Sequence, residues 1–498
     1  MAERTAEQLE SGFFDVRRQS PVTTETVRRQ VAEPGSPVLV DFDHTLFASN
    51  STELFISRCR PSLVVALIDF LVRVCVPWRL VPAGRGHRVG DYLCVALIVV
   101  LTPWNLSLWR KAAPALFEQH RAAEISAVLA DVDRSRLTII SFGMEFVIRD
   151  LLRASEYRSA ALLATPLLPR PSWFAGGKTT TAVGAVGEDG VARAVFVSDS
   201  LDDADLLGAC RSGLLIPQQG RRVSARERLY LPMRYTARVK YSRWYALDQF
   251  LLVDALVIAI AITRDAASLL HFAVIAPLLL LSVMSVYEIG YFENDVHGSK
   301  IEEHPVLDPS VPQYRDYPIR VQAWVWAAAS AAAGLGTAVL LGELGTDELL
   351  AAGTSWVLLL LVLRGVFFLY NRVRTDVRVF VYPVLQALKY GAVFLVFAPT
   401  ALGVALVMSQ VTAMWATYVV YRLGGRKEDL DRDLLGTAAF LVAAGLLGMA
   451  SIAHGGPFEE GAGREAESPV PLVAALLWSL ARACKSPVMR RVRARLAT

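Results

Sequence analysis

The sequence predicts an α/β domain followed by an all-α polytopic membrane domain of about eight helices. First, 54% of the 498 residues are hydrophobic and only 20% are charged, whereas about 25% are charged in typical soluble domains. Second, short apolar runs alternate with helix-length segments from Pro37 to Gly220. Third, the apolar stretches after Trp244 approach the roughly 20 residues that a bilayer needs. This composition excludes a disordered or collagen-like chain, and the small net charge of +4 gives no reason to expect a nucleic-acid partner.

Four short runs in the first half have the character of buried strands. Each is separated from the next by enough sequence for a helix, which is typical of a mostly parallel sheet. Three of the four end in Asp or Ser, and the carboxyl ends of parallel strands are where such folds build their sites. The predicted strands are Ser36–Asp41, Arg136–Ser141, Ala160–Ala164 and Ala194–Asp199.

Changes in composition predict five consecutive segments. The first is polar and has no apolar core of a signal peptide, so we expect the N-terminus in the cytoplasm. Eight basic residues fall between Arg221 and Arg243. Directly before a hydrophobic helix, this pattern favours a face held against anionic lipid over a solvated loop. The expected segments are 1–35 (polar), 36–220 (α/β domain), 221–243 (basic linker), 244–484 (membrane domain) and 485–498 (basic tail).

The membrane domain is predicted from eight apolar stretches and the charges between them. Basic residues gather in alternate connections and in the C-terminal tail, which places both termini and the α/β domain on the cytoplasmic side. We therefore expect an integral protein of a bacterial-type inner membrane. The expected spans are Tyr245–Thr263, His271–Tyr287, Val321–Leu341, Leu349–Tyr370, Val379–Phe397, Leu402–Tyr421, Leu434–Ala453 and Val470–Ala483.

Asp41 and Asp43 follow the first predicted strand directly, in Asp41-Phe-Asp-His-Thr45. Carboxylates at i and i+2 point the same way from a sheet, so that with a metal one can attack while the other moves a proton. The motif resembles the phosphatase form of the haloacid-dehalogenase (HAD) superfamily. The superfamily's other motifs follow in order over about residues 36–215: Ser141 after the second strand, Lys178 in Gly-Gly-Lys-Thr, and Asp199-Ser-Leu-Asp-Asp203.

The resemblance implies a Rossmann-like fold and a role for each of these residues. Asp41 is the nucleophile that forms an aspartyl-phosphate, and Asp43 is the general acid and base. Ser141 and Lys178 bind the phosphoryl group, whose charged oxygens need positive charge to approach a carboxylate. His44 stands where the family usually has Gly, which we interpret as a tolerated loop substitution. The implied cofactor is Mg²⁺, held by Asp41, Asp43, Asp199 and Asp203.

The family carries a helical cap between its first two motifs, here about residues 55–130. This region contains two unusually apolar stretches, Ser62–Trp78 and Asp91–Trp109. Three arrangements are open: a cap that dips into the membrane interface, which we favour, a hairpin of two spans, or an ordinary soluble cap. A cap on the membrane surface implies a phosphate substrate carried by a lipid.

A second candidate site lies in the membrane domain. Asn294-Asp295 resembles the first aspartate-rich motif of the UbiA-type prenyltransferase superfamily, in a degraded form in which Gly298 and Glu302 replace Asp. The resemblance implies binding of Mg²⁺-diphosphate, with a second motif in Asp429-Leu-Asp-Arg-Asp433. Charged groups within spans usually face a polar cavity. Arg364 and Lys389 lie at comparable depth in adjacent predicted spans, so we expect them to hold a phosphate together. The predicted second site is Asn294, Asp295, Glu302, Asp429, Asp433, Arg364 and Lys389.

Two functions follow from these resemblances. The first is a bifunctional membrane enzyme that hydrolyses a phosphomonoester and also catalyses UbiA-like transfer involving a polyprenyl (di)phosphate. Phosphoribosyl transfer to polyprenyl phosphate, followed by dephosphorylation, is one such sequence. The alternative is a HAD phosphatase with a lipid-binding membrane domain that is not catalytic. The expected partner is a membrane lipid, and the prenyl chain, the acceptor and the oligomeric state remain open.

Overall fold

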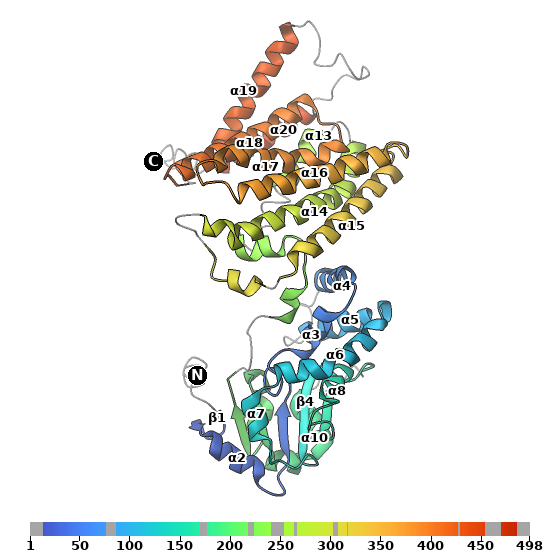
Figure 1. The fold of residues 1–498 in the computed structure, drawn as a ribbon, viewed down its shortest axis with the longest axis vertical. Helices are drawn as coiled ribbons and strands as arrows, with labels where there is room; N and C mark the ends of the chain where they lie inside the picture. The colour runs from blue at the N-terminus through green and yellow to red at the C-terminus, as the bar shows by residue number, and fades with distance from the viewer. Residues whose placement is uncertain are drawn as a thin grey trace. The chain divides into compact units, whose positions relative to one another are not determined.

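The computed structural model describes residues 13–75, 86–169, 177–217, 224–240, 253–262, 266–301, 307–315, 317–426, 429–453 and 470–485. The chain forms two compact units, Met1–Tyr230 and Leu231–Thr498. In Figure 1 the ribbon is coloured by residue number, from blue at the start of the first unit to red at the end of the second. The division falls within the basic segment 221–243. Each unit is described by itself below.

The first unit is built on a seven-stranded sheet in the order β2-β1-β7-β6-β3-β4-β5. Five strands, β7 to β5 in that order, are parallel, and β1 pairs antiparallel with β7 and with β2. The four strands predicted from sequence correspond to β3, β4, β5 and β6. The strands are β1 (Phe13–Asp15), β2 (Ser20–Val22), β3 (Val38–Asp41), β4 (Leu137–Met144), β5 (Ala161–Thr165), β6 (Val195–Ser198) and β7 (Ser212–Leu215).

Residues 13–32 add two strands and a helix to this unit, whereas the sequence suggested only a polar segment before residue 36. Phe13 and Phe14 of β1 are buried, and Phe14 pairs with Leu215 of β7. Helix α2 (Thr24–Ala32) buries Val27 and Val31. Two apolar pairs in an otherwise polar stretch were too weak a signal to predict a strand and a helix.

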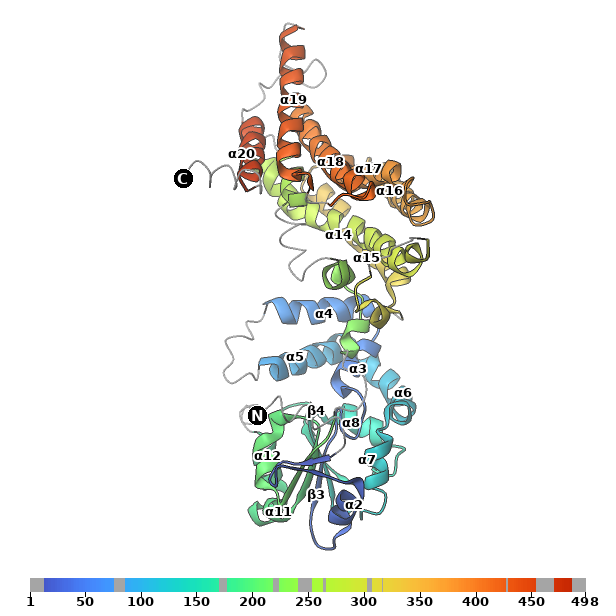
Figure 2. The ribbon, with the colours of Figure 1, turned by 90° about the vertical axis from the view of Figure 1, so that its left-hand side faces the viewer.

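Helices cover both faces of the sheet, as the edge-on view in Figure 2 shows. The chain runs from β3 through β4 to β5 in one direction and then returns to β6 and β7 on the other side of β3. The strand order therefore reverses beside β3, and the crevice at such a reversal is where open α/β sheets bind ligands. One face carries α7 (Ala123–Val128) and α8 (Glu145–Leu152), and the other carries α10 (Lys178–Val186), α11 (Glu188–Arg193) and α12 (Ala204–Ala209).

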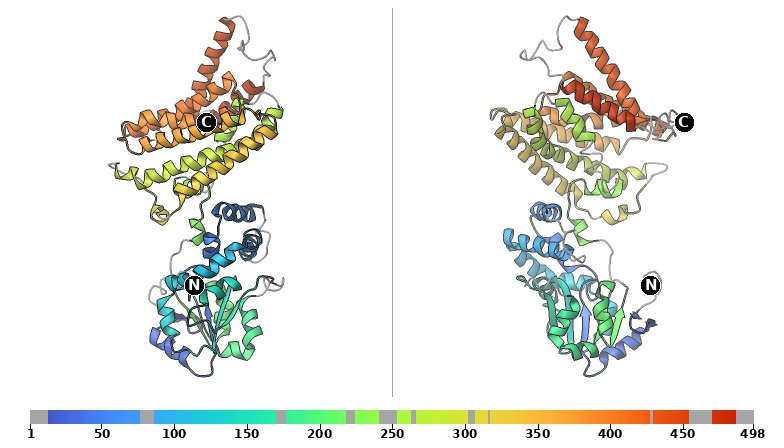
Figure 3. Two further views of the ribbon diagram at one scale, coloured as in Figure 1. Left: turned by 45° about the vertical axis from the view of Figure 1, so that its right-hand side comes forward. Right: turned by 180° about the vertical axis from the view of Figure 1, so that it is seen from behind.

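The long connection from β3 to β4 forms a helical cap, made of α3 (Ser51–Arg58), α4 (Ser62–Cys75), α5 (Gly86–Leu101) and α6 (Trp104–His120). Helices α4 and α5 lie side by side in Figures 2 and 3. Helix α6 is fixed to the α/β core, because Trp109 Nε1 donates to the Val147 carbonyl at 3.2 Å and its ring packs on Phe55. Helices α5 and α6 meet at a bend of 114°.

The second unit is helical, and five of its described helices are long and apolar enough to cross a membrane, or six in the whole chain if the bent pair in the cap counts as one span. The unit is therefore that of an integral membrane protein. Residues 245–252 and 263 of the first expected span lie outside the described residues. The helices are α13 (Leu256–Ile262), α14 (Ala266–Val296), α15 (Ile319–Leu340), α16 (Leu349–Tyr370), α17 (Arg378–Gly391), α18 (Ala401–Arg422), α19 (Arg432–Ala453) and α20 (Val470–Lys485).

Helix α14 organises this unit and continues beyond the span that the sequence predicted. It packs closely against α16, because a Cβ at Gly290 would lie 2.3 Å from the Phe367 ring. Trp356 of α16 donates to Ser282 of α14 at 3.0 Å, which satisfies two buried polar groups in the same contact. The continuation of α14 to Val296 places Glu288 and Asp295 seven residues apart on one helix.

Candidate functional site

The first site lies at the carboxyl edge of the central strand β3. Asp41 is the last residue of β3, and Asp43 follows it in the turn. The chain reverses at His44, which has a φ of 58°. This left-handed conformation suits Gly best and is several-fold enriched in His among other residues, which explains how His44 occupies this position.

Lys178 connects two of the acidic residues. It is the first residue of α10, and its Nζ lies 2.7 Å from Asp41 Oδ1 and 2.7 Å from Asp203 Oδ2. Asp203, at the end of the short helix η4 (Leu201–Asp203), also accepts from Ser198 Oγ at 2.7 Å. All three ionic groups are at least nine-tenths buried. Asp203 therefore holds the ammonium group of Lys178 against Asp41.

Asp43 is held by backbone and hydroxyl donors instead of a cation. Its Oδ1 accepts from the Ser51 backbone N–H at 2.6 Å, and its Oδ2 accepts from Ser141 Oγ at 3.1 Å. The Gly143 N–H in turn donates to Ser141 Oγ at 2.8 Å. A Cβ at Gly143 would lie 2.9 Å from Ser51 Oγ and 3.1 Å from Ser141 Oγ. Only glycine leaves room for both hydroxyls beside Asp43.

Asp199 joins the same group of residues through Thr45. Thr45 Oγ1 donates to Asp199 Oδ1 at 3.1 Å and accepts from the Asp199 N–H at 3.0 Å. This reciprocal pair connects the turn after β3 to the loop after β6. All six residues that the sequence assigned to this site, from Asp41 to Asp203, are therefore brought to one edge of the sheet.

Burial raises the pKa of Asp41 from its ordinary value to about 7; the Lys178 charge opposes this rise, and the nearby Asp203 and Asp199 charges add to it. Burial likewise raises the pKa of Asp43 and of Asp199 above the ordinary range. For Lys178, burial lowers the pKa, but Asp41 and Asp203 outweigh it and raise the pKa overall. Lys178 thus pairs with only two of the four carboxyl groups, Asp41 and Asp203.

The chemistry of these donors fits a hard divalent cation, which takes carboxylate oxygens. Among the described residues no three His, Cys, Asp or Glu side chains are grouped to hold a metal by themselves. Mg²⁺ is commonly bound through one or two carboxylates together with water and substrate phosphate. Asp41, Asp43 and Asp199 would supply such oxygens, whereas Asp203 is occupied by Lys178 and Ser198.

A cavity of about 190 Å³ opens beside these residues. The core contributes Asp41, Asp43, Ser141 and Lys178 to its wall, and the cap contributes three residues of α5. Reasoning from the sequence missed the α5 residues, because the apolar stretch around them masks their short polar face. Their spacing of i, i+3 and i+4 was the available signal. They are Arg88, Asp91 and Tyr92.

The helical unit contains a second cavity, of about 700 Å³. Of the residues that the sequence predicted for a membrane site, Asn294 and Asp295 of α14 line it. The Asn294 Oδ1 is buried and has no hydrogen-bond partner among the described residues. Aromatic hydroxyls from α14, α16, α17 and α18 form much of the wall: Tyr287, Tyr291, Tyr370, Tyr382, Tyr418 and Tyr421.

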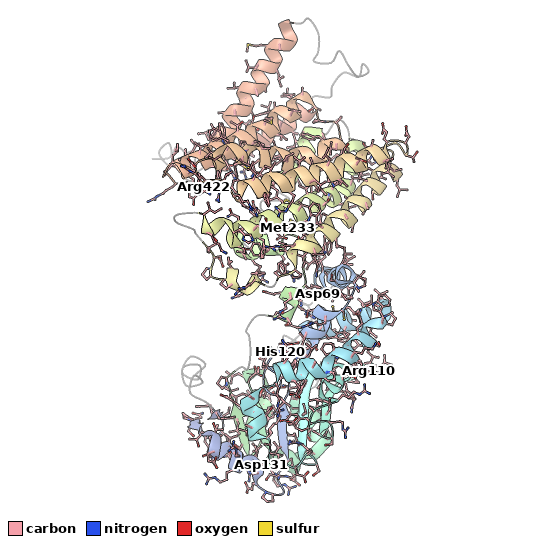
Figure 4. The ribbon with its side chains drawn as sticks, in the orientation of Figure 1. Asp69, Arg110, His120, Asp131, Met233 and Arg422 are labelled. Atoms are coloured by element: carbon pink, nitrogen blue, oxygen red, sulfur yellow. The ribbon has the colours of Figure 1, made fainter. Side chains whose placement is uncertain are left out.

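The basic segment before the first span contributes to this cavity. Lys240, at the end of the π-helix η6 (Thr236–Lys240), lines it and forms an ion pair with Asp295. Asp295 also accepts from the Tyr235 hydroxyl at 2.6 Å. Glu288, which is fully buried, accepts from the Met233 N–H at 3.0 Å; Figure 4 labels Met233. The expectation that this segment faces lipid is wrong at Lys240, because its ammonium group lines the cavity and pairs there with Asp295.

The remaining predicted residues of the membrane site have separate partners. Arg364 Nη2 lies 2.6 Å from Glu293 Oε1, and Lys389 Nζ lies 2.9 Å from Asp254 Oδ2. The structure therefore does not bring Arg364 and Lys389 together as one phosphate-binding pair. Asp433 forms an ion pair with Arg482, and Asp429 accepts from the Arg426 N–H at 2.7 Å. Glu302 lies outside the described residues.

Two arginines in the second cavity were not predicted. Arg422 ends α18, and its Nε donates to the Tyr418 hydroxyl at 2.8 Å; Arg432 begins α19. Figure 4 labels Arg422. The Tyr418 hydroxyl also lies 2.7 Å from the Tyr370 hydroxyl. In the sequence these arginines flank a charged loop, so they looked like ordinary loop charges.

Comparisons of the chain with protein-family models, with curated proteins and with solved structures gave no match.

Proposed function

We propose that the first unit is a Mg²⁺-dependent phosphatase of the HAD type that hydrolyses phosphomonoesters through an aspartyl-phosphate. The observation that carries this proposal is the convergence of Asp41, Asp43, Ser141 and Lys178 on one cavity at the switch point of a parallel sheet. These residues come from three separated parts of the chain, and a structural role for each would not require a shared cavity.

In the proposed reaction Asp41 attacks the phosphorus atom, and the bond to the leaving oxygen breaks. Asp43 donates its proton to that oxygen, which its raised pKa favours. Asp43 then accepts a proton from water as the water attacks the phosphorus of the aspartyl-phosphate, which releases phosphate and restores Asp41. Lys178 and Ser141 bind the phosphoryl oxygens, and Asp203 keeps Lys178 in place.

Mg²⁺, held by the carboxylates of Asp41 and Asp199, would supply the positive charge that the transferring phosphoryl group needs. Burial is the largest cause of the raised pKa values of these two carboxyl groups, and a bound cation would offset that cost by stabilising their ionised forms.

We further propose that the substrate is lipid-linked, because the cap presents an apolar face. Val74 is 63% exposed, Val100 is 74% exposed and Leu101 is 56% exposed. Most of the exposed large apolar side chains of this unit lie on α4, α5 and the start of α6. Such a face supports a cap that lies in the membrane interface. The residues are Leu67, Phe70, Leu71, Val74, Leu97, Val100, Leu101, Trp104 and Leu108.

For the helical unit we propose UbiA-like transfer involving a polyprenyl (di)phosphate, at the cavity lined by Asn294 and Asp295. The basic side chains Lys240, Arg422 and Arg432 in its wall support an anionic ligand there. The buried Asn294 Oδ1, which has no hydrogen-bond partner among the described residues, could accept from a hydrated cation that accompanies this ligand. Phosphoribosyl transfer to polyprenyl phosphate would yield a phosphomonoester for the phosphatase. One observation favours the alternative of a lipid-binding unit without catalysis: Asp295 is already paired with Lys240 and Tyr235.

The test of the phosphatase is phosphate release by the full chain in detergent with Mg²⁺. The substrates are a panel of soluble and prenyl-linked phosphomonoesters, and the comparison is wild type against Asp41→Asn. We expect release from lipid-linked substrates that Asp41→Asn abolishes. Equal release by both proteins, or none from any substrate, contradicts the assignment of Asp41.

A second assay separates the two proposals for the helical unit. Transfer of a radiolabelled phosphoribosyl group from phosphoribosyl diphosphate to polyprenyl phosphate is measured in wild type and in Asp295→Asn. Loss of transfer in Asp295→Asn supports catalysis. The matched control is Asp376→Asn, which changes an exposed carboxylate in the loop between α16 and α17 and should leave transfer unchanged. Binding of polyprenyl phosphate without transfer supports the non-catalytic alternative.

A further inference from the structure

Two basic residues line the cavity of the first unit, and only one of them belongs to the proposed catalytic group. Lys178 lies between Asp41 and Asp203. The other is Arg88, in the first turns of cap helix α5. The reaction proposed above gives Arg88 no role.

Arg88 is positioned by an aromatic ring at the mouth of the catalytic group. Its Cζ lies 3.8 Å from the centroid of the Phe142 ring, and Lys178 Nζ lies 5.8 Å from the same centroid. Arg88 Cζ and Lys178 Nζ therefore lie near the same ring, and their separation cannot exceed the sum of their distances to its centroid. Phe142 follows Ser141 directly in β4, so the ring that supports Arg88 is fixed to the strand that carries the phosphoryl-binding hydroxyl.

The helix that carries Arg88 is fixed on two sides. Asp91, one turn further along α5, lies 2.7 Å from Nη1 of the buried Arg226. The Tyr92 hydroxyl donates to the Leu167 carbonyl at 3.0 Å. Arg226 belongs to the short helix η5 (Ala225–Arg228), and Glu53 of α3 accepts from both Ser224 Oγ and the Ala225 N–H. Arg88 thus projects from a braced helix.

The charge balance differs between the two sides of the cavity. On the core side, carboxyl groups outnumber the single lysine. On the cap side, Asp91 is paired with Arg226, and Arg88 contributes a guanidinium group to the wall of the cavity. A guanidinium binds phosphate and carboxylate oxygens through two parallel N–H groups. The cap side of the cavity is therefore suited to a second anionic group beside the phosphomonoester.

We propose that Arg88 is a specificity-determining residue that binds a second anionic group of the substrate, a phosphodiester or carboxylate separated from the hydrolysed phosphate by a sugar-sized spacer. This inference rests on the proposed phosphatase function and deepens it by naming the substrate class. The cavity volume of about 190 Å³ suits a small polar head group, since pockets for drug-sized ligands span about 300–1,000 Å³.

Two soluble probes test the proposal, ribose 5-phosphate and its 1-(methyl phosphate) diester. Each carries one phosphomonoester, and the second also carries the phosphodiester anion. In the full chain with Mg²⁺ we expect the diester probe to have a KM about tenfold lower or more, the effect of one charge-assisted contact. Arg88→Gln should remove this difference by raising KM for the diester probe alone, with kcat unchanged. Arg88→Lys should restore part of it.

Arg149→Gln, an exposed change on α8, is the matched control and should leave both KM values unchanged. An equal loss of kcat/KM for both probes in Arg88→Gln overturns the proposal, because it places Arg88 at the reacting phosphoryl group or in the framework. Unchanged KM values in Arg88→Gln overturn it as well.

A binding measurement separates failure of this inference from failure of the phosphatase proposal. Calorimetric titration of both probes into Asp41→Asn and into Asp41→Asn with Arg88→Gln requires no turnover. About tenfold weaker binding of the diester probe alone in the second protein supports the role of Arg88, even if no phosphate is released. Equal binding of both probes by the two proteins overturns it.

Discussion

Lys178 Nζ lies 2.7 Å from Asp41 Oδ1, which places the one lysine among the described residues of the cavity wall directly against the proposed nucleophile. Burial and neighbouring carboxylates raise the pKa of Asp41, and Lys178 opposes them. The same contact thus serves two purposes, because it opposes the rise of the Asp41 pKa and provides a charge for the phosphoryl group.

The contact predicts the pH dependence of phosphate release. The nucleophile must be ionised, and its pKa is about 7 without bound metal. A Mg²⁺ ion at Asp41 lowers that pKa, so the rate should rise with pH to a plateau, with a midpoint at or below about 7. Lys178→Met should lower kcat by about 10²–10³-fold and move the midpoint to higher pH, because the charge that lowers the pKa is lost. A pH–rate profile of both proteins measures this. Lys111→Met, an exposed change on α6, should leave the profile unchanged, and a midpoint that moves to lower pH contradicts the prediction.

The free energy of unfolding should fall with rising pH, whereas the rate of phosphate release should increase. Folded Asp41 retains its proton up to about pH 7, whereas an unfolded Asp loses it near pH 3.9. Between about pH 4 and 7 the folded state therefore binds more protons, and the free energy of unfolding falls as the pH rises. Asp41→Asn removes this pH-dependent loss of stability, because Asn does not ionise. Above pH 7 it should melt at least about 2–4 °C higher than wild type, the shift that about 1 kcal/mol gives in a domain of this size.

Thermal unfolding of the full chain at several pH values from 5 to 8 measures the effect of Asp41→Asn. Asp205→Asn on α12 removes an exposed carboxylate and serves as the control, with no comparable shift expected. A lower melting temperature for Asp41→Asn at pH 8 would falsify the assignment of a raised pKa.

The buried Arg226 should be important for the stability of the cap. It lies 2.7 Å from Asp91 and 3.5 Å from Asp69, and Asp69 is 1% exposed. Figure 4 labels Asp69. Arg226→Met leaves these carboxylates without their buried partner, which costs about 3–5 kcal/mol. Arg73→Met removes the other arginine at Asp69, but its side chain is 52% exposed, so we expect at most about 1 kcal/mol. Urea unfolding measures the free energy of unfolding of both variants. An equal decrease in Arg226→Met and Arg73→Met contradicts the prediction.

The apolar face of the cap should matter for lipid-linked substrates alone. Val74→Ser with Val100→Ser removes two of its most exposed apolar side chains. Each buried Val contributes about 1.5–3 kcal/mol, so activity on a prenyl-linked phosphomonoester in vesicles should fall by about tenfold or more. Activity on ribose 5-phosphate in the same protein is the internal control. An equal fall on both substrates contradicts the membrane role of this face.

Lys389 of α17 should be needed to neutralise Asp254 and not to bind a ligand. Asp254 is 2% exposed, and it contacts Lys389 at 2.9 Å and the Tyr390 hydroxyl at 2.6 Å. Lys389→Met should lower the melting temperature of the full chain by several degrees, because an unpaired buried carboxylate costs about 3–5 kcal/mol. Adding Asp254→Leu should recover most of that loss. No recovery in the double variant contradicts the pairing.

Much of the first site was predictable from sequence, because its residues lie at the ends of strands. Asp41 and Ser141 could be placed at one edge once their strands were predicted to be parallel, and the structure shows that these strands, β3 and β4, are neighbours. The cap side was not predictable in this way. Arg88 reaches the cavity through the packing of α5, and neither the periodicity nor the composition of an apolar helix indicates which of its polar residues will face inward.

The membrane site was harder to predict, because charges in an apolar sequence can pair in many ways. The predicted span ended at Tyr287, whereas α14 continues to Val296 and carries both Glu288 and Asp295. The partners of Arg364 and Lys389 were not predictable, since each pairs with a carboxylate from another part of the chain. The cavity residues Arg422 and Arg432 lie at the ends of helices that only the folded unit brings together.

By itself the sequence determined the division into a parallel α/β unit and a helical membrane unit, because hydrophobic patterning is a local property of the chain. It also indicated the acidic residues of the first site, since strand ends share an edge, whereas Lys178 was indicated only by the resemblance of its motif. The tertiary structure alone decided which charges are paired, which cap residues reach the cavity and which residues line the cavity of the helical unit. These depend on contacts between distant segments, where the energetic cost of a buried charge selects one partner among several.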